Sequence, residues 1–191
     1  MLKSLQEVRS EWKGLLKVRR TADIIRIKIK SNRAKEGRNT MIRKMQTADI
    51  DRIAEIWLNT NLKAHDFIPS EYWKENYEAV KEMIFQAEVY VYIDENKNEL
   101  QGFIGLDEEY IAGIFVWSEA QSRGIGKCLL DRAKEEKRKL TLNVYAQNPG
   151  AVRFYQREGF RIAGEDTDED TGEKEHLMCW EAEKDSDSIC D

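Results

Sequence analysis

Two glycines one residue apart, Gly124 and Gly126, begin an amphipathic helical pattern shortly after an apolar run typical of a buried strand. The first N–H groups of a helix lack intrahelical partners and the helix dipole is positive there, so such an end can bind an anion. Glycine also removes the Cβ atoms that would hold a phosphate at a distance. A tight strand-to-helix turn can require glycine for packing alone, so phosphate binding and a structural turn both stay open. The Gly-Lys-Ser/Thr ending of a Walker loop is missing, and Leu129 stands where a dinucleotide fingerprint needs its third glycine.

The chain from Met41 onward alternates strand patterns with helix patterns. Apolar runs predict strands at residues 41–45, 88–94, 100–106, 110–117, 140–147, 160–166 and 175–183. Helical periodicity predicts one helix capped by Thr47, one capped by Ser70, one over 124–137, and one that Asn148 caps and that ends at Glu158. The predicted inward face of the 124–137 helix comprises Ile125, Cys128, Leu129 and Ala133. The order predicts a mixed α/β fold with six to seven strands and about four helices.

Length and composition limit the chain to one domain with appendages. It has 191 residues, of which 41% are hydrophobic, and no apolar stretch approaches the roughly 20 residues of a membrane helix. The N-terminus lacks the apolar block of a secretory signal, so we expect a cytoplasmic protein without membrane contact. Three cysteines without metal-ligand spacing and only two histidines predict no metal site.

Charge is distributed unevenly along the chain. Residues 1–40 contain 12 lysines and arginines against 4 acidic residues, whereas the remainder has 19 against 32. We therefore expect a basic, poorly ordered extension over 1–40, a folded domain over 41–183 and an acidic tail over 184–191. The extension is either an upstream addition or a misplaced start. A nucleic-acid or acidic-partner arm is conceivable on charge, but solvated leaders of this kind are more common, so nucleic acid is not the favoured partner.

A second motif occupies residues 148–160, "NPGAVRFYQREGF". Helical spacing makes Ala151, Phe154, Tyr155 and Glu158 neighbours, and a helix this short needs tertiary contacts or a ligand to hold it. The two aromatic residues have an ordinary interpretation as core packing. A functional interpretation is favoured by their position in the chain. Both glycine-bearing helices follow a buried strand, so the N-termini of the two helices can face the same end of the sheet.

Residues 41–183 resemble the GNAT superfamily of acyl-CoA-dependent N-acetyltransferases, in its small single-domain bacterial type. "QSRGIG" matches the superfamily's Arg/Gln-x-x-Gly-x-Gly/Ala pyrophosphate loop, and "NPGAVRFYQREGF" matches its Asn-x-x-Ala-x-x-Phe-Tyr-x-x-x-Gly-Phe segment. The resemblance implies a V-splayed central sheet with acetyl-CoA in the opening. The cofactor contacts it implies are Phe115, Val116, Gln121, Ser122, Arg123, Gly124, Ile125, Gly126, Lys127, Asn148, Ala151, Phe154 and Tyr155.

The same resemblance assigns chemical roles. Tyr155 matches the general acid that protonates the departing thiolate, since a tyrosine of ordinary pKa near 10 keeps its proton at neutral pH. The oxyanion donor is expected from the backbone amide of Phe115 or Val116. For the base, Glu108 within the acidic string 107–109 competes with His65, which lies beside a carboxylate in the break between the first two helices. The ordinary interpretations are a solvated strand connection for the glutamate, and a cap or solvent-facing ring for the histidine.

The sequence thus predicts an N-acetyltransferase that uses acetyl-CoA in a ternary complex, by direct attack of a primary amine. The acidic body favours a cationic acceptor such as a polyamine, an aminoglycoside-like sugar or a lysine side chain, and the string "AHDFIPSEYW" is similar to one in small bacterial members linked to protein-lysine acetylation. A non-catalytic acyl-CoA-binding or regulatory module is the alternative. A longer acyl donor and a homodimer stay open, and no cysteine is placed for a covalent acetyl-enzyme.

Overall fold

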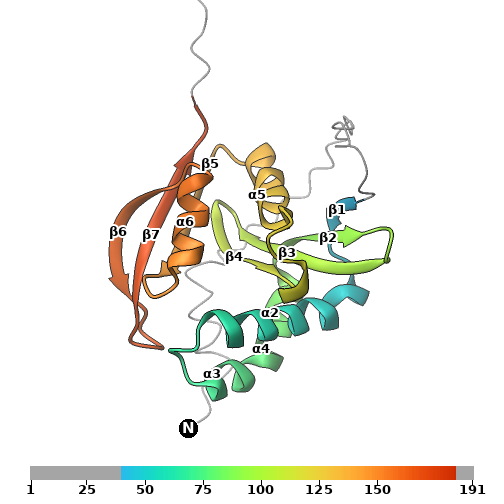
Figure 1. Ribbon diagram of the computed structural model, residues 1–191, viewed down its shortest axis with the longest axis horizontal. Helices are drawn as coiled ribbons and strands as arrows, with labels where there is room; N and C mark the ends of the chain where they lie inside the picture. The colour runs from blue at the N-terminus through green and yellow to red at the C-terminus, as the bar shows by residue number, and fades with distance from the viewer. Residues whose placement is uncertain (1–39, 184–191) are drawn as a thin grey trace, which may run out of the picture.

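The computed structural model describes residues 40–183, which form a seven-stranded sheet covered by helices on both faces (Figure 1). The strands are β1 Thr40–Lys44, β2 Glu88–Asp94, β3 Glu99–Asp107, β4 Tyr110–Val116, β5 Lys139–Tyr145, β6 Arg161–Thr167 and β7 Lys174–Glu181. The helices are η1 Thr47–Asp49, α2 Ile50–Ala64, α3 Ser70–Glu75, α4 Tyr77–Gln86, η2 Ser118–Ala120, α5 Ile125–Glu136 and α6 Pro149–Arg157. The predicted basic extension and acidic tail lie outside the described residues.

The sheet is mixed and divides into two arms. Its strand order is β1-β2-β3-β4-β5-β7-β6, with antiparallel pairing everywhere except between β4 and β5, which are parallel. In the described chain, β4 and β5 share one register pair, Tyr110 with Thr141, next to a hydrogen bond of 2.9 Å from the Thr141 N–H to the Glu109 carbonyl. Beyond that point the strands part, as the predicted splay requires, and leave arms β1–β4 and β5–β7–β6.

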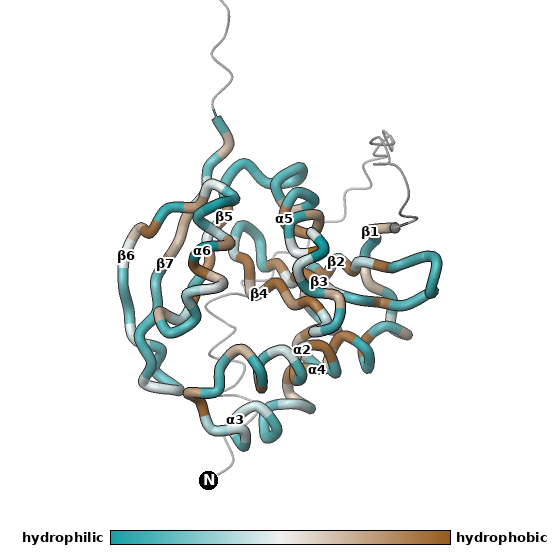
Figure 2. Tube along the Cα trace, viewed as in Figure 1, coloured by the Kyte–Doolittle hydropathy of each residue, from teal (hydrophilic) through white to brown (hydrophobic). Residues whose placement is uncertain are grey.

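Each face of the sheet carries its own apolar core. Ile53, Ala54 and Ile56 of α2 are fully buried against the β1–β4 arm, together with apolar residues of α4. On the opposite face Leu129 and Leu130 of α5 are equally buried and share a core with α6, with strands β2–β4 and with the β5–β7 arm. Figure 2 shows the hydrophobic stretches concentrated along the central strands β3 and β4. Burial of each of these isoleucine and leucine side chains stabilises the fold by about 1.5 to 3 kcal/mol.

The helix starts differ from the predicted caps. Thr47 belongs to the 3-10 turn η1, and Gln46 occupies the cap position, where its N–H donates to the Asp49 carboxylate at 2.7 Å. Ser70 is the first residue of α3 after Pro69. The predicted second helix is also interrupted at Asn76, so two helices replace one. Asn148 is the cap that was predicted correctly, because its side-chain oxygen accepts the Ala151 N–H at 3.1 Å.

The inward face of α5 differs from the prediction at one residue. Cys128 is exposed, whereas Leu130 is 0% exposed and takes its place in the core. Both residues neighbour Leu129, so helical periodicity does not choose between them. The larger apolar side chain is the one buried, since it removes more apolar surface from water.

Candidate active site

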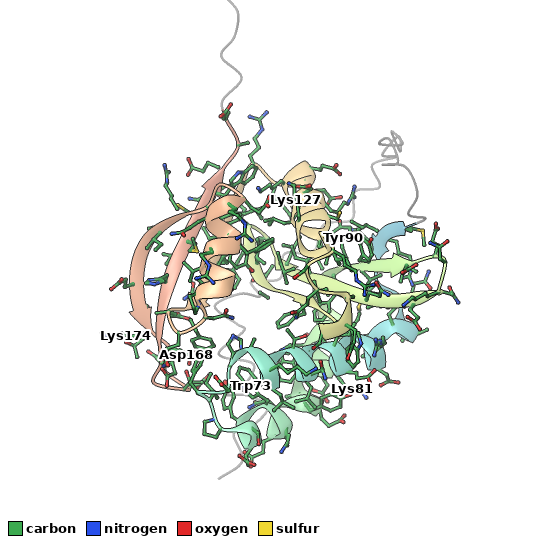
Figure 3. All side chains as sticks on the ribbon, in the orientation of Figure 1. Trp73, Lys81, Tyr90, Lys127, Asp168 and Lys174 are labelled. Carbon is green, nitrogen blue, oxygen red and sulfur yellow. The ribbon has the colours of Figure 1, made fainter. Side chains whose placement is uncertain are left out.

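A cavity of about 380 Å³ lies where the two arms of the sheet part. Its walls come from α2, α3, α4, β4, β5, α6 and the connection between β6 and β7. Figure 3 shows Trp73 on the helical side and Asp168 near the ends of β6 and β7. Residues from opposite ends of the chain therefore surround one space, which no single sequence motif defines.

The predicted site residues fall into two groups. The structure brings His65, Phe115, Asn148, Ala151 and Tyr155 together as lining of this cavity. The predicted residues that do not line it are Val116, Gln121, Ser122, Arg123, Gly124, Ile125, Gly126, Lys127, Phe154 and Glu108. Most of the second group belongs to the loop and first turn of α5, which lie outside this cavity.

The start of α5 has the properties of an anion-binding helix end. Gly124 adopts φ 85°, which an L side chain rarely does, and no side chain caps the helix. The first intrahelical bond runs from Cys128 N–H to the Gly124 carbonyl at 3.0 Å, so the N–H groups of Ile125, Gly126 and Lys127 precede it. The Lys127 ammonium already pairs with Asp131 and Glu158, at 2.9 and 3.0 Å. The backbone amides of this first turn are donors available to a phosphate, and the residues present fit the pyrophosphate of CoA.

Gly126 faces the second motif directly. A Cβ built at this glycine lies 3.5 Å from the Phe154 ring, which is ordinary van der Waals contact. Phe154 in turn contacts Tyr155 edge-on, with 5.1 Å between ring centroids. The two sequence motifs thus meet through Phe154, which packs between the start of α5 and the cavity.

The alternation of backbone groups along β4 directs the N–H and C=O of Val116 toward the gap between β4 and β5. The Trp117 N–H donates to the Gln101 carbonyl of β3 at 2.8 Å, and residues two apart on a strand point the same way, so the Phe115 N–H also faces β3. Val116 must then face away from β3. Its carbonyl accepts the Gln121 side-chain N–H at 3.1 Å, on the side that β5 has left. Of the two amides predicted as oxyanion donors, the geometry favours Val116.

Tyr155 presents a buried phenol to the cavity. The residue is 8% exposed and its ring packs edge-on against Phe160, with 5.5 Å between centroids. Burial raises the pKa of Tyr155 well above its usual value, and the nearby Tyr110 adds to the shift. The phenol therefore keeps its proton at neutral pH and has the protonation state that a general acid needs.

An acidic wall lies opposite the helices and was missed from the sequence. Asp168, Asp170 and Glu175 line the cavity from β7 and the preceding turn. Burial raises the pKa of the Glu175 carboxyl, which also accepts a hydrogen bond from the Asn143 side chain. The sequence showed only an acidic turn between two late strands. The antiparallel register that places Glu175 opposite Tyr145 of β5 carries it to the cavity.

The two residues predicted as bases have different surroundings. Glu108 sits in the tight turn between β3 and β4 with φ 51°, and its side chain is exposed. His65 ends α2, where its Nδ1 lies 3.0 Å from the Asn61 side-chain oxygen and its Nε2 lies 3.3 Å from the Asn148 side-chain nitrogen. Burial lowers the pKa of His65 to about 4, so the ring is neutral at physiological pH.

The described residues contain neither a metal-binding cluster nor a membrane-spanning helix. Over residues 40–183, no group of three or more histidine, cysteine or acidic side chains is arranged to hold a metal ion. In the same range, no helix combines the length and the apolar character needed to cross a membrane.

The fold and site together define an acyl-CoA-dependent N-acyltransferase. A model of the acetyltransferase (GNAT) domain matches residues 59–181, and the chain therefore belongs to the GNAT family of N-acetyltransferases. It is 32% identical over 141 residues to the peptidyl-lysine N-acetyltransferase YiaC of Escherichia coli strain K12, an alignment covering 73% of this chain and 96% of that one. This match confirms the predicted family and enzyme class.

Solved structures share the fold. The apo form of YjaB from Escherichia coli superposes with a TM-score of 0.68 at 24% identity, over 76% of this chain and 99% of that one. The PaiA N-acetyltransferase of Thermoplasma acidophilum, solved with coenzyme A, gives a TM-score of 0.62 at 20% identity, over 75% and 99% of the two chains. The mixed splayed sheet that the sequence predicted is thus confirmed as that of GNAT acetyltransferases.

Proposed function

We propose that this chain transfers the acetyl group of acetyl-CoA to the side-chain amine of a lysine in a peptide or protein, by direct attack in a ternary complex. The observation that carries the proposal is the cavity in which the Tyr155 phenol and the carboxylates of Asp168 and Glu175 share one space. The peptidyl-lysine activity named for the Escherichia coli relative at 32% identity supports a lysine acceptor.

Acetyl-CoA supplies a thioester whose acyl carbon accepts the amine. The amides at the start of α5 bind its pyrophosphate, and the residues from Gln121 to Lys127 are proposed for this contact. Val116 offers its N–H to the acyl oxygen as negative charge develops there. The remaining predicted contacts, Asn148, Ala151 and Phe154, hold α6 against the same space.

Proton movements follow from the two sides of the cavity. A lysine ammonium, with an ordinary pKa near 10.4, must lose a proton before its nitrogen can attack. Glu175 is proposed to take this proton, since burial raises the pKa of its carboxyl and makes it a stronger base than an exposed glutamate. The carbon–nitrogen bond forms, the carbon–sulfur bond breaks, and the Tyr155 phenol protonates the departing thiolate. Asp168 and Asp170 favour entry of a cationic acceptor.

We propose direct attack rather than a covalent acetyl-cysteine intermediate. The sequence argued against such an intermediate because Cys128 was expected on the buried face of its helix, whereas the structure gives a different reason. Cys128 is exposed on α5 and is not part of the cavity lining, so its thiol lies away from Tyr155 and the acidic wall. The non-catalytic alternative gains no support from the relatives, which are named as acetyltransferases.

The test is a thiol-release assay on the full chain with acetyl-CoA and a lysine peptide, with the same peptide carrying arginine for lysine as control. Spermidine is the competing acceptor class. Tyr155→Phe should lower kcat about 100-fold and leave the Kd for acetyl-CoA within about twofold. Tyr92→Phe, at a buried tyrosine outside the cavity, is the matched control. Release with spermidine but with no lysine peptide would overturn the lysine assignment, and an unchanged kcat would remove Tyr155 from the role of acid.

A further inference from the structure

A continuous line of hydrogen bonds joins α2 to α6 along one wall of the cavity. The Asn61 side-chain nitrogen donates to the Trp57 carbonyl at 2.9 Å, and the Asn61 oxygen lies 3.0 Å from His65 Nδ1. His65 Nε2 lies 3.3 Å from the Asn148 side-chain nitrogen, and the Asn148 oxygen accepts the Ala151 N–H at 3.1 Å. Five residues of two distant helices are thereby connected through one imidazole ring.

The two ends of this line fix the direction of every bond in it. A backbone carbonyl only accepts, so Asn61 must turn its nitrogen toward Trp57 and its oxygen toward His65. A backbone N–H only donates, so Asn148 must turn its oxygen toward Ala151 and its nitrogen toward His65. The ring must then donate from Nδ1 and accept at Nε2. His65 is therefore neutral and its proton is on Nδ1, with both nitrogens engaged.

This line of hydrogen bonds spans the opening where β4 and β5 are not paired. Helix α2 packs on the β1–β4 arm, and α6 packs with the β5–β7 arm. Those arms share the Tyr110–Thr141 register pair in the described chain. The His65–Asn148 bond thus connects the arms on the far side of the cavity, in addition to the apolar core that α5 shares with both of them.

Aromatic rings pack around the connection and partly shield it from water. The His65 ring packs against Phe67, Trp73 and Tyr145, with centroid separations of 5.6, 5.5 and 5.1 Å. Tyr145 belongs to β5 and Trp73 to α3, so both sides of the opening contribute to the enclosure. Hydrogen bonds in such surroundings are stronger than in water, and an unpaired group there is costly.

We propose that His65 is a positioning residue that fixes the width of the acceptor cavity, and that it is not the general base. Its Nε2 lone pair is committed to Asn148, which caps α6, and α6 carries Tyr155. Loss of the link removes the hydrogen bond that holds the start of α6 toward α2, while the apolar core and the α5 lysines keep its other end in place, so the phenol is displaced. This role rests on the proposed function, whereas the hydrogen-bond line itself is a property of the protein without any substrate.

The direct test is nitrogen NMR of the full chain at pH 7. The two histidines of the sequence, His65 and His176, are distinguished by recording the His65→Gln variant. We expect His65 to show a protonated Nδ1 and an unprotonated Nε2, with a coupling across the bond to the Asn148 side-chain nitrogen. A ring protonated at Nε2, or one exchanging between tautomers, would overturn the proposal even if the protein acetylates nothing.

The kinetic test compares two substitutions of similar bulk. His65→Gln offers one donor and one acceptor and can keep the direction of the line, but an amide cannot act as a base. His65→Leu removes both bonds. We expect His65→Leu to lower kcat about tenfold and to raise the KM for the lysine peptide, with the KM for acetyl-CoA unchanged, and His65→Gln to recover most of the loss. Equal loss in both variants would mean that restoring a donor and an acceptor at this position is not enough, and would overturn the positioning role.

Discussion

Tyr110 of β4 and Thr141 of β5 are the one register pair that joins these strands in the described chain. All other neighbouring strands of the sheet pair over at least five residues. The parallel pairing is therefore short, and the cavity lies directly beyond it. Tyr110, a member of the register pair, also lines the cavity.

The two glycines of α5 should respond differently to alanine. Gly124 has φ 85°, and a left-handed conformation costs an L residue about 1 to 2 kcal/mol. In Gly124→Ala the loop relaxes away from this conformation, and ligand binding has to restore it. Titration calorimetry should show affinity for acetyl-CoA reduced about tenfold, equivalent to about 1.4 kcal/mol.

Gly126→Ala is the matched control for that substitution. The added methyl group meets the Phe154 ring at 3.5 Å, and alanine is favoured over glycine in a helix by up to about 1 kcal/mol. We expect an unchanged or slightly higher melting temperature and little change in affinity. Equal weakening by both variants would mean that close approach of the ligand to Gly126, and not the backbone conformation of Gly124, is what the loop requires.

Glu175→Gln should reduce acetylation of a lysine peptide without affecting acetyl-CoA affinity. The amide oxygen can still accept from Asn143, so the wall keeps its packing, but the proton acceptor is lost. We expect kcat/KM to fall at least about tenfold. In the wild type the rate should fall as pH drops through the raised pKa of Glu175, and this limb should be absent from the variant's pH profile.

Glu108→Gln is the competing variant, because the sequence placed the base there. Its side chain is exposed in the β3–β4 turn, outside the cavity lining. We expect a change of less than about threefold in kcat/KM. A large loss of kcat/KM in Glu108→Gln, with a normal value in Glu175→Gln, would show that Glu108 of the β3–β4 turn is the base.

Acid should destabilise the protein through His65. The folded-state pKa is lowered to about 4 from 6.5 by burial alone, so the unfolded chain takes up a proton near pH 6.5 that the folded chain refuses until near pH 4. Stability is then constant with respect to this group above pH 6.5 and falls between pH 6.5 and 4, by about 2 kcal/mol after allowance for partial exposure of the ring.

Urea unfolding at pH 7.5 and pH 5 measures this effect, with His65→Gln as the reference. The difference between the two pH values should be smaller in the variant, because glutamine does not titrate. The expectation fails if wild type and variant lose stability equally on acidification.

The thiol of Cys128 should report on ligand binding. It is exposed in the first turn of α5, close to the amides proposed to bind the pyrophosphate, and thiol reactivity depends on exposure. In a Cys190→Ser background we expect alkylation of Cys128 to be faster than that of the half-buried Cys179, and acetyl-CoA to slow it several-fold. Mass spectrometry of the labelled peptides distinguishes the two sites. An unchanged rate at saturating acetyl-CoA would show that the ligand does not cover this turn.

Local patterns predicted most of the elements, and tertiary relationships decided the rest. The strands and the 124–137 helix follow from apolar periodicity, and the Asn148 cap follows from the chemistry of one side chain. The Thr47 cap was wrong because Asp49, three residues after Gln46, accepts the Gln46 N–H and shifts the start of the helical turn. Cys128 was wrong because periodicity treats it and Leu130 alike.

The candidate site divides in the same way. The glycine loop and Tyr155 lie in contiguous motifs and were found from them. The role of Glu175 depends on strand register and on burial, neither of which is visible in a string of acidic residues. His65 was identified, but its two asparagine partners lie 4 and 83 residues away, and only the fold brings the second one to it.

The early parting of β4 and β5 also bears on solubility. A strand edge with unpaired backbone groups is a template for strand addition by another chain, and proteins protect such edges by charge, twist or covering elements. Here the two edges created by the opening face one another inside the molecule, and Gln121 covers the Val116 carbonyl at one end. A neighbouring polypeptide has no flat edge to join at this point. The unpaired backbone groups of β4 and β5 are therefore accessible only to a ligand small enough to enter the cavity between the strands.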